Sequence, residues 1–273
     1  MDVPGFALIT GAASGIGRAC AKAFVNEGSA GVALLDMHEE ALIQVKAEME
    51  EVIKQRKGHG NGTKLLMHHV DVSQEQQVNQ AISETAQAFG QIDYLVNAAG
   101  IAIFPDGGAA SLQTEDWSRT LSVNLSGSFF VLRATAQLML KQEPILSSID
   151  NRPLQRGSII NVASIYGLTG RSQATAYSAA KHGVVGMTRS AAEEYAEAGL
   201  RINAICPGYV DTPMIRSNPE VLDFAMGTVK TLVPSRRLGQ ASEVADGVLY
   251  LAGGRSSYVT GSALAVDGGY TAI

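Results

Sequence analysis

Short apolar runs alternate with longer stretches of helical periodicity along the whole chain. Each run is long enough for a β-strand and ends near glycine, proline, asparagine, aspartate or serine. The expected strands are Phe6–Thr10, Gly31–Leu35, Leu65–Val70, Ile92–Val96, Ser158–Val162, Arg201–Ile205 and Ala263–Val266. Seven strands alternating with helices predict an α/β fold, a doubly wound parallel seven-stranded sheet in three α/β/α layers.

The segments between these runs are predicted to be mostly helical. The expected helices are His38–Lys57, Ser73–Gly90 with a capping box at Ser73-x-x-Gln76, Thr114–Gln142 interrupted by Asn124 and Gly127, a helix from Tyr177 to Ala198, and Ser242–Leu251. Gly58–Gly62 is expected to be a flexible turn and Glu143–Arg156, with two prolines, a surface excursion. We expect one domain over residues 1–273, with a lid at about 209–234.

Composition narrows the class of protein. The chain has 273 residues, 46% apolar and 17% charged, which is typical of a folded globular protein. A net charge of −5 argues against nucleic acid as a partner, and no apolar run is long enough to span a membrane. Because a strand is predicted from Phe6, we expect no signal peptide. Cys20 and Cys206 form no disulfide framework or metal cluster, so we expect both to be buried and the protein to be cytoplasmic.

A glycine-rich turn follows the first strand. Gly11-Ala12-Ala13-Ser14-Gly15-Ile16-Gly17 leads into a helix that ends near Gly28, and this strand–turn–helix order is typical of a Rossmann-like dinucleotide site. Asp36 ends the second strand, where a carboxylate can bind an adenosine ribose and repel a 2′-phosphate. Asp36 could instead cap the next helix together with Glu39. With Met37 following rather than a basic residue, NAD is favoured over NADP.

Tyr177 and Lys181 are the candidate catalytic pair. On one helix they lie four residues apart on the same face, with roughly 5–6 Å between their Cβ atoms. An ammonium group beside a phenol is expected to lower the phenol pKa, which suits general acid–base catalysis. Asn124, within an otherwise helical stretch, is either a tolerated polar residue at a kink or a polar group directed at the lysine. In a parallel sheet, Gly11–Gly17, Asp36, Asp71, Asn97, Ser164 and Pro207–Thr212 all fall at the carboxyl ends of strands, where ligands bind.

These residues resemble the short-chain dehydrogenase/reductase family over nearly the whole chain. The matching motifs are Thr10-Gly11-x-x-x-Gly15-Ile16-Gly17, Asp71-Val72, Asn97-Ala98-Ala99-Gly100, Asn124, Ser164, Tyr177-x-x-x-Lys181 and Pro207-Gly208 with Thr212 following. Ala98 departs from the pattern, since the family often has a second asparagine there that helps to tie the central strands.

The resemblance implies a role for each matching residue. Tyr177 would be the acid/base, Lys181 would lower its pKa and hold the nicotinamide ribose, Ser164 would bind the reacting oxygen and Asn124 would position a water. Around the cofactor, Gly11, Ser14, Ile16 and Gly17 would surround the phosphates and adjacent ribose, Asp71 and Val72 would flank adenine, Asn97 would contact a ribose, and Val210 and Thr212 would hold the carboxamide. The expected activity is NAD-dependent interconversion of a secondary alcohol and a ketone, with no metal.

Three loops are expected to line a mostly apolar substrate pocket: Ile101–Gly108, Ile165–Gln173 and Tyr209–Met226. Their apolar residues include Ile103, Phe104, Ile165, Tyr166, Leu168, Met214, Ile215, Leu222 and Phe224. Glu193, Glu194 and Glu197 would repel an acidic carrier protein, which favours a free small molecule. An NADP-dependent 3-oxoacyl or ketone reductase and a catalytically silent NAD-binding regulatory module remain the alternatives. By the resemblance we expect a homotetramer or homodimer through helices in Gln113–Gln142 and Tyr177–Ala198.

Overall fold

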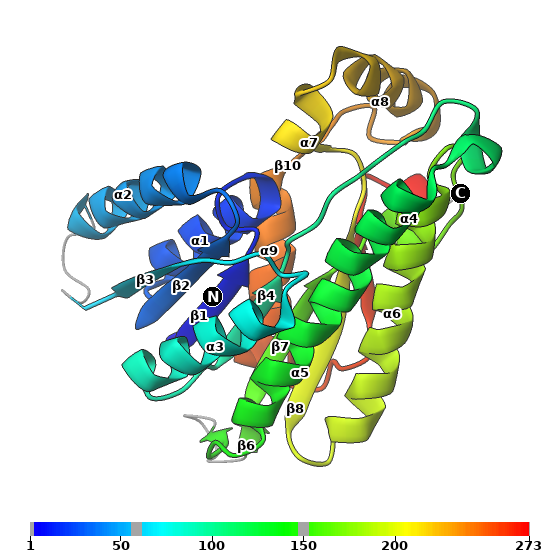
Figure 1. The fold of residues 1–273 in the computed structure, drawn as a ribbon. Coiled ribbons are helices and arrows are strands. Elements are labelled where there is room, and N and C mark those ends of the chain that lie inside the picture. The colour runs from blue at the N-terminus through cyan, green and yellow to red at the C-terminus, as the bar shows by residue number, and fades with distance from the viewer. Residues whose placement is uncertain (1–2, 56–61, 147–152, 273) are drawn as a thin grey trace.

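Seven parallel strands form the central sheet of the protein, in the order β11-β8-β7-β4-β1-β2-β3 (Figure 1). The structure is a computed structural model that describes residues 3–55, 62–146 and 153–272. The strands are β1 (Phe6–Thr10), β2 (Gly31–Asp36), β3 (Lys64–His69), β4 (Tyr94–Asn97), β7 (Gly157–Val162), β8 (Leu200–Pro207) and β11 (Ala263–Val266). The predicted doubly wound sheet is confirmed, and each predicted strand end lies within about two residues of the observed one.

Burial explains why the central strands have continuous apolar sequences. All residues of β2 and of β8 are buried, because helices cover both faces of the sheet. Within the described part of the chain the edge strand β3 pairs with β2 alone, and its residues are half-buried or exposed. His68 and His69 belong to this strand, as the sequence predicted.

Helices cover the two faces of the sheet in separate layers (Figure 1). One layer contains α1 (Gly15–Glu27), α2 (Glu39–Gln55) and α9 (Ala241–Ala252), and the other contains α3 (Glu75–Phe89), α4 (Thr114–Leu121), α5 (Ser128–Met139) and α6 (Thr175–Tyr195). Phe24, Val45 and Val248 belong to the core under the first layer, whereas Val78 and Val131 belong to the core under the second. Among the described residues, no helix is long and apolar enough to cross a bilayer.

Because the strands of the sheet are parallel, their carboxyl ends lie together, and the candidate functional residues gather at that end of the sheet. The chain passes from β1 to β2 and β3 on one side, and β4 then pairs with β1 on the other side. A ligand crevice forms at such a reversal, outside the carboxyl ends of the strands. Two helices of the predicted lid, α7 (Pro213–Arg216) and α8 (Pro219–Leu232), follow β8 and the short strand β9 (Val210–Asp211), which pairs with β10 (Gly239–Gln240).

The described ends of the segment Glu143–Arg156 form regular structure, which differs from the expected surface excursion. Its ends form an antiparallel pair, β5 (Ile145–Leu146) with β6 (Pro153–Gln155). Gln155 is buried, and its Oε1 accepts a hydrogen bond from Nε of buried Arg201 at 2.8 Å. The prediction was wrong for Gln155 because its partner lies 46 residues away in the sequence. Residues 147–152, and all but Gly62 of the expected turn at Gly58–Gly62, lie outside the described residues.

Two predicted helices begin or continue differently from expectation. The capping box at Ser73 is wrong: α3 begins at Glu75 with Gln74 as its N-cap, because the Ser73 hydroxyl donates to Oδ1 of Asp71 at 2.8 Å instead. The helical stretch 114–142 ends at Met139 and contains a π-helix, η2 (Ser122–Gly127), between α4 and α5. Asn124 lies in this wide turn, which accounts for the interruption that the sequence indicated.

Candidate active site

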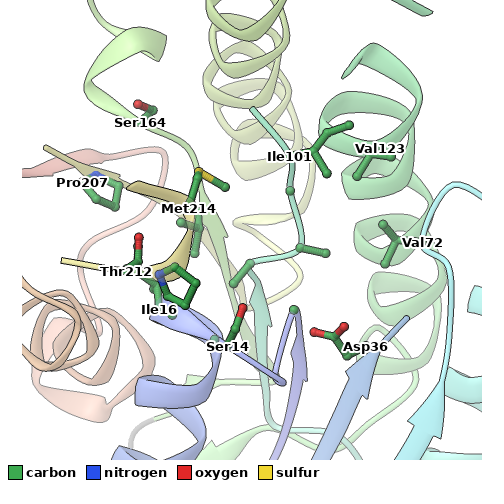
Figure 2. Close-up of a pocket in the computed structure, with 18 of the residues that line it drawn as sticks. Ser14, Ile16, Asp36, Val72, Ile101, Val123, Ser164, Pro207, Thr212 and Met214 are labelled. Carbon is green, nitrogen blue, oxygen red and sulfur yellow. The ribbon is translucent and has the colours of Figure 1, made fainter. Parts of the chain in front are cut away.

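A cavity of about 250 Å³ follows the carboxyl ends of the strands (Figure 2). Figure 2 shows Asp36 and Val72 on one side of it, Ser164 and Pro207 on the other, and Ser14 between them. The cavity is lined by most of the residues that the sequence singled out, namely Gly11, Ser14, Ile16, Gly17, Asp36, Asp71, Val72, Ser164, Tyr177, Lys181, Val210 and Thr212. Asn97 and Asn124 are not in this lining.

The glycine-rich turn gives this cavity an anion-binding wall. Gly11 and Gly15 have φ values of 65° and 50°, a left-handed conformation that side chains other than glycine rarely adopt. A Cβ atom at Gly17 would lie 2.1 Å from the carbonyl oxygen of Gly11, so α1 starts in direct contact with the turn. Ser14, the N-cap of α1, makes no side-chain cap bond, and the first turn of α1 has no acidic residue. The free N–H groups and the positive end of the helix dipole therefore suit a pyrophosphate.

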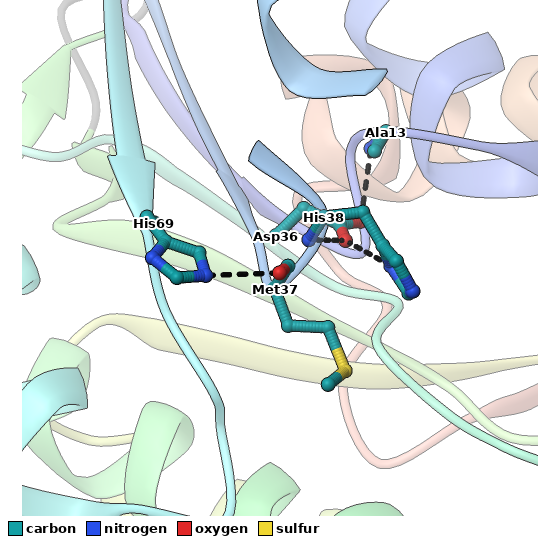
Figure 3. A network of polar contacts seen from close by, with 5 residues as sticks. All are labelled: Ala13, Asp36, Met37, His38 and His69. Carbon is teal, nitrogen blue, oxygen red and sulfur yellow. Dashed lines mark hydrogen bonds and ion pairs between the residues drawn. The ribbon is translucent and has the colours of Figure 1, made fainter. Parts of the chain in front are cut away.

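Asp36 connects this turn to the end of β2 (Figure 3). Its Oδ2 accepts a hydrogen bond from the backbone N–H of Ala13 at 3.0 Å. Its Oδ1 accepts from the backbone N–H of His38 at 3.0 Å and lies 3.1 Å from Nδ1 of the same residue. Asp36 thus helps to order the start of α2, and its carboxylate also lines the cavity.

A basic side chain of α1 is paired with a carboxylate of a neighbouring helix. Arg18 pairs with Glu48 of α2, its Nε donating to Oε2 at 3.0 Å. Because this guanidinium already has a carboxylate partner, the cavity beside Asp36 presents a negative group and no competing arginine from α1.

Asn97 lies behind the cavity in a network that ties the central strands. Its Nδ2 donates to the carbonyl oxygen of Ser128 at 2.8 Å and to Oδ1 of Asn161 at 3.2 Å, and its Oδ1 accepts from the Thr10 hydroxyl at 3.3 Å. The Thr10 oxygen also accepts from the backbone N–H of Ala98 and of Ala99, both at 3.0 Å. The strands are therefore tied together even though Ala98 replaces the second asparagine. Since Asn97 is 2% exposed, we propose a structural role for its side chain instead of ribose binding.

Asn124 clamps the loop that follows β4. Its Oδ1 accepts from the backbone N–H of Ile101 and its Nδ2 donates to the carbonyl oxygen of Ile101, both at 2.8 Å. The π-helix brings this fully buried amide to the loop, next to Gly100, where a Cβ atom would lie 2.9 Å from Oδ1 of Asn124 and 3.6 Å from Nζ of Lys181. Asn124 therefore holds the loop beside Lys181 through its side chain.

Ser164, Tyr177 and Lys181 meet where the cavity passes between β7 and α6. Ser164 follows β7 and caps the short 3₁₀ helix η3 (Ile165–Gly167), its Oγ accepting from the backbone N–H of Tyr166 at 3.1 Å. Nζ of Lys181 donates to the carbonyl oxygen of Val162 at 2.8 Å. All three side chains are 9% exposed or less, so water has little access to them.

Burial is the main cause of the pKa shifts of Tyr177 and Lys181. It raises the pKa of Tyr177 to about 12, while the neighbouring Ser164 hydroxyl acts in the opposite direction. Burial lowers the pKa of Lys181 to about 8. Desolvation of the phenol is the largest cause of its raised pKa, and the Lys181 ammonium group, which was expected to lower that pKa, donates to the Val162 carbonyl oxygen. At neutral pH the phenol is therefore protonated and can donate its proton.

The loop after β8 closes the cavity at the other side of the glycine-rich turn. The Thr212 hydroxyl donates to the carbonyl oxygen of Val210 at 3.3 Å. A Cβ atom at Gly15 would lie 3.4 Å from Cγ2 of Thr212, so the base of the lid and the turn are in contact range. Met214 of α7 adds an apolar side chain to this wall (Figure 2). Ile215 of the same helix also lines the cavity.

A second cavity of about 220 Å³ adjoins the first. Ser164 and Tyr177 line both cavities. The three loops named from the sequence supply its walls, with Phe104, Ile165, Tyr166, Met214, Ile215 and Phe224 among the lining residues. Ile103, Leu168 and Leu222, which were also expected, line neither cavity, and Leu168 packs instead against a core cluster that contains Val184.

The sequence reasoning missed two polar features of this second cavity. Tyr166 and Tyr209 join their hydroxyl groups at 2.6 Å, and burial raises the Tyr166 pKa well above its ordinary value. Arg171 also lines the cavity. The available signal was the position of a single arginine inside a loop already expected to contact substrate. Among the described residues, no group of three histidine, cysteine, aspartate or glutamate side chains could hold a metal ion.

Comparison with known proteins agrees with the fold and the site. The family profile described as enoyl-(acyl carrier protein) reductase matches residues 11–271. The chain is 38% identical over 273 residues to the short-chain dehydrogenase fogB of Aspergillus ruber, covering 99% of this chain and 98% of that protein. It is 37% identical over 262 residues to the 3-oxoacyl-(acyl-carrier-protein) reductase FabG of Thermotoga maritima, covering 96% of each. The crystal structure of levodione reductase aligns with a TM-score of 0.87 at 34% identity, covering 99% of this chain and 98% of that one.

The fold and these relatives define an oxidoreductase that acts on a CH–OH group with a nicotinamide dinucleotide. The chain belongs to the short-chain dehydrogenase/reductase family.

Proposed function

We propose that this protein interconverts a secondary alcohol and a ketone on a free small molecule, with NAD as its cofactor. The supporting observation is that Ser164 and Tyr177 line both the cavity with the glycine-rich wall and the neighbouring, largely apolar one. A reacting carbon at this junction lies between a dinucleotide in the first cavity and the rest of the substrate in the second. The nicotinamide supplies hydride transfer when it is bound, and the protein supplies orientation and proton handling.

The roles of the side chains follow from their positions. The Tyr177 phenol donates a proton to the substrate oxygen during reduction, and its phenolate accepts one during oxidation. Ser164 holds that oxygen by a hydrogen bond. Lys181, bonded to Val162, is buried within the first cavity and provides a cation for a ribose hydroxyl. Asn124 keeps the adjoining loop in place through Ile101. Met214 and Ile215 restrict the access of water to the junction.

The preference for NAD rests on Asp36. Its carboxylate lines the first cavity near Val72, and Arg18 is already paired with Glu48. A 2′-phosphate placed there would meet a negative charge with no arginine from α1 to offset it, whereas a ribose hydroxyl could donate to Asp36. Asp71 and Val72 would flank the adenine, and Val210 and Thr212 would hold the carboxamide.

Replacing Tyr177 with phenylalanine tests the enzymatic proposal. A panel of secondary alcohols with NAD is assayed by the absorbance of the reduced nicotinamide. We expect Tyr177→Phe to lower turnover about 10²–10⁴-fold while NAD still binds, because only proton transfer is lost. Unchanged turnover in the variant would overturn the mechanism. Binding of NAD with no turnover of any alcohol by the native protein would favour a silent regulatory module.

An NADP-dependent 3-oxoacyl reductase is the second candidate, favoured by the similarity to FabG. Glu193, Glu194 and Glu197 are exposed near the end of α6, where they would repel an acidic carrier protein. Comparing turnover of a 3-oxoacyl group on a carrier and on a small thioester separates the two candidates. A strong preference for the carrier-bound form, together with NADPH, would replace the proposed function by this one.

Exposed aromatic side chains and buried cysteines bear on the oligomeric state and the cellular location of the protein. Trp117 of α4 and Phe129 of α5 are 37% and 41% exposed, and such aromatic side chains are typical of subunit interfaces. We propose a homotetramer or homodimer through α4, α5 and α6, which light scattering would measure directly. Cys20 and Cys206 are free and buried, which suits the reducing cytoplasm that we propose as the location.

A further inference from the structure

Arg171 lies in the wall of the second cavity, in the loop between η3 and α6. Its guanidinium carbon is 4.7 Å from the centre of the Phe224 ring, and its Nη2 donates a hydrogen bond to the Thr228 hydroxyl at 3.1 Å. Phe224 and Thr228 are both residues of α8. The lid helix therefore holds the guanidinium by stacking and by one hydrogen bond.

The remaining donors of Arg171 are not fully used. Its Nε is buried and has no hydrogen-bond partner within the described part of the chain. A guanidinium group has five N–H donors and no acceptor, and buried donors in proteins are nearly always paired. An acceptor for this donor can come from solvent or from a ligand in the cavity that Arg171 lines.

Several other arginines of this protein have a carboxylate partner, whereas Arg171 has none among the described residues. Four arginines pair with carboxylates at or near the surface, in the pairs Arg18–Glu48, Arg133–Glu75, Arg216–Asp211 and Arg237–Glu243. Across residues 3–55, 62–146 and 153–272, no such ion pair involves Arg171. Asp106 and Glu220 also line the second cavity, but both are exposed, so water solvates and screens them.

Tyr166 lines the same cavity as Arg171 and contacts the candidate catalytic residue Tyr177. The Tyr166 ring contacts the Tyr177 ring edge to face, with 6.2 Å between the ring centres. The positive charge of Arg171 acts on the Tyr166 hydroxyl, where it opposes the rise of the pKa that burial causes. Arg171 and Tyr177 line the same cavity of about 220 Å³, so a small substrate there can contact Arg171 at one end and Tyr177 at the other.

We propose that Arg171 binds an anionic oxygen group of the substrate, so that the enzyme acts on a hydroxy acid and its oxo acid. This inference rests on the proposed function and names the substrate class for the same site. A planar guanidinium with a free Nε–H matches a carboxylate better than a lysine would, because two parallel N–H···O bonds can form. The aromatic and aliphatic walls contact the carbon skeleton between the two polar ends.

Binding of simple aromatic probes tests this assignment without turnover. Benzoate, benzenesulfonate and benzamide are titrated calorimetrically into the full-length protein with NAD present. We expect both anions to bind at least about tenfold more tightly than benzamide, with benzoate the tighter anion. The preference is expected to disappear in Arg171→Met and to weaken in Arg171→Lys. Arg216→Met, which removes an exposed arginine of the neighbouring helix α7, is the matched control and should keep it.

Equal affinities for the three probes in the native protein, no detectable anion binding, or a preference that survives Arg171→Met would each overturn the inference. A kinetic comparison separates its failure from failure of the proposed function. For a secondary hydroxy acid and its methyl ester, Arg171→Met should raise the KM of the acid about 10–100-fold and leave the ester nearly unchanged. An equal loss for both substrates assigns Arg171 a structural role and overturns the proposal. The effect of Tyr177→Phe on both substrates tests the enzymatic function independently.

Discussion

Nζ of Lys181 lies 5.6 Å from the centre of the Tyr177 ring, one helical turn away, and both side chains are buried. The two groups are close, but each is dominated by its own loss of water. Burial raises the pKa of the phenol to about 12 and lowers that of the ammonium group to about 8. Both shifts favour the neutral form, and each gives a measurable consequence.

The reaction should depend on pH differently in its two directions. Alcohol oxidation needs the phenolate of Tyr177, which is scarce below the pKa of about 12. We expect kcat/KM for oxidation to rise steadily from neutral to alkaline pH. Carbonyl reduction needs the protonated phenol, so its rate should not rise over the same range. Initial rates measured in both directions across that range check this, and oxidation that is independent of pH would contradict it.

Lys181 should reduce the stability of the fold at neutral pH. Its pKa falls from 10.5 in the unfolded chain to about 8 in the folded protein. The unfolded chain therefore holds more protons between these values, and stability rises with pH across that window. We expect Lys181→Met to raise the free energy of unfolding at pH 7 by about 1–2 kcal/mol, after allowing for the lost bond to Val162.

Urea unfolding at several pH values measures this difference. The advantage of Lys181→Met should shrink as the pH rises from about 8 towards 10.5, while its turnover stays low at every pH. An advantage that does not change with pH would mean that the lysine is not the source of the effect.

Asp36 should control the choice of cofactor. Asp36→Asn removes the charge but keeps an amide oxygen that can accept from the Ala13 or His38 N–H. We expect NADP to bind about tenfold more tightly than to the native protein, with a much smaller change for NAD. Calorimetric titration with each cofactor checks the prediction. If NADP gains no affinity, the carboxylate does not lie at the 2′ position.

Gly17 should be intolerant of a side chain. In Gly17→Ala the new Cβ would meet the Gly11 carbonyl oxygen at 2.1 Å, and one of the two backbone segments must move. We expect a loss of cofactor affinity of at least about tenfold, because the anion-binding turn shifts. Gly186→Ala is the control: its Cβ meets no atom of the described residues within 4 Å, and alanine in α6 should raise stability by about 0.5–1 kcal/mol. Equal cofactor affinity in both variants would contradict the expectation.

Asn97 should matter for stability more than for binding. Asn97→Ala removes the partner of the Ser128 carbonyl, the Thr10 hydroxyl and Asn161 together. We expect a loss of about 2–4 kcal/mol in the free energy of unfolding, with NAD affinity of the folded variant changed less than about threefold. Unfolding curves and titration below the transition measure both. A large loss of affinity at unchanged stability would restore the ribose-binding role.

The sequence by itself determined the strand order along the chain, the parallel sheet and the position of the functional edge. These follow from local signals: continuous apolar runs such as Gly31–Asp36, the glycine-rich turn, and the spacing of Tyr177 and Lys181 on one helix. The interruption of the helix at Asn124 was also predicted from the sequence, because asparagine and glycine are poor residues for a helix interior.

Tertiary structure alone decided the properties that depend on partners distant in sequence. It placed Asn97 in a buried network, brought Gln155 to Arg201, and set the pKa of Tyr177 by desolvation rather than by its neighbour on the helix. It also left Nε of Arg171 without an acceptor among the described residues. Burial and hydrogen-bond pairing are set by the whole packed environment of a group, and the order of residues along a chain does not specify them locally.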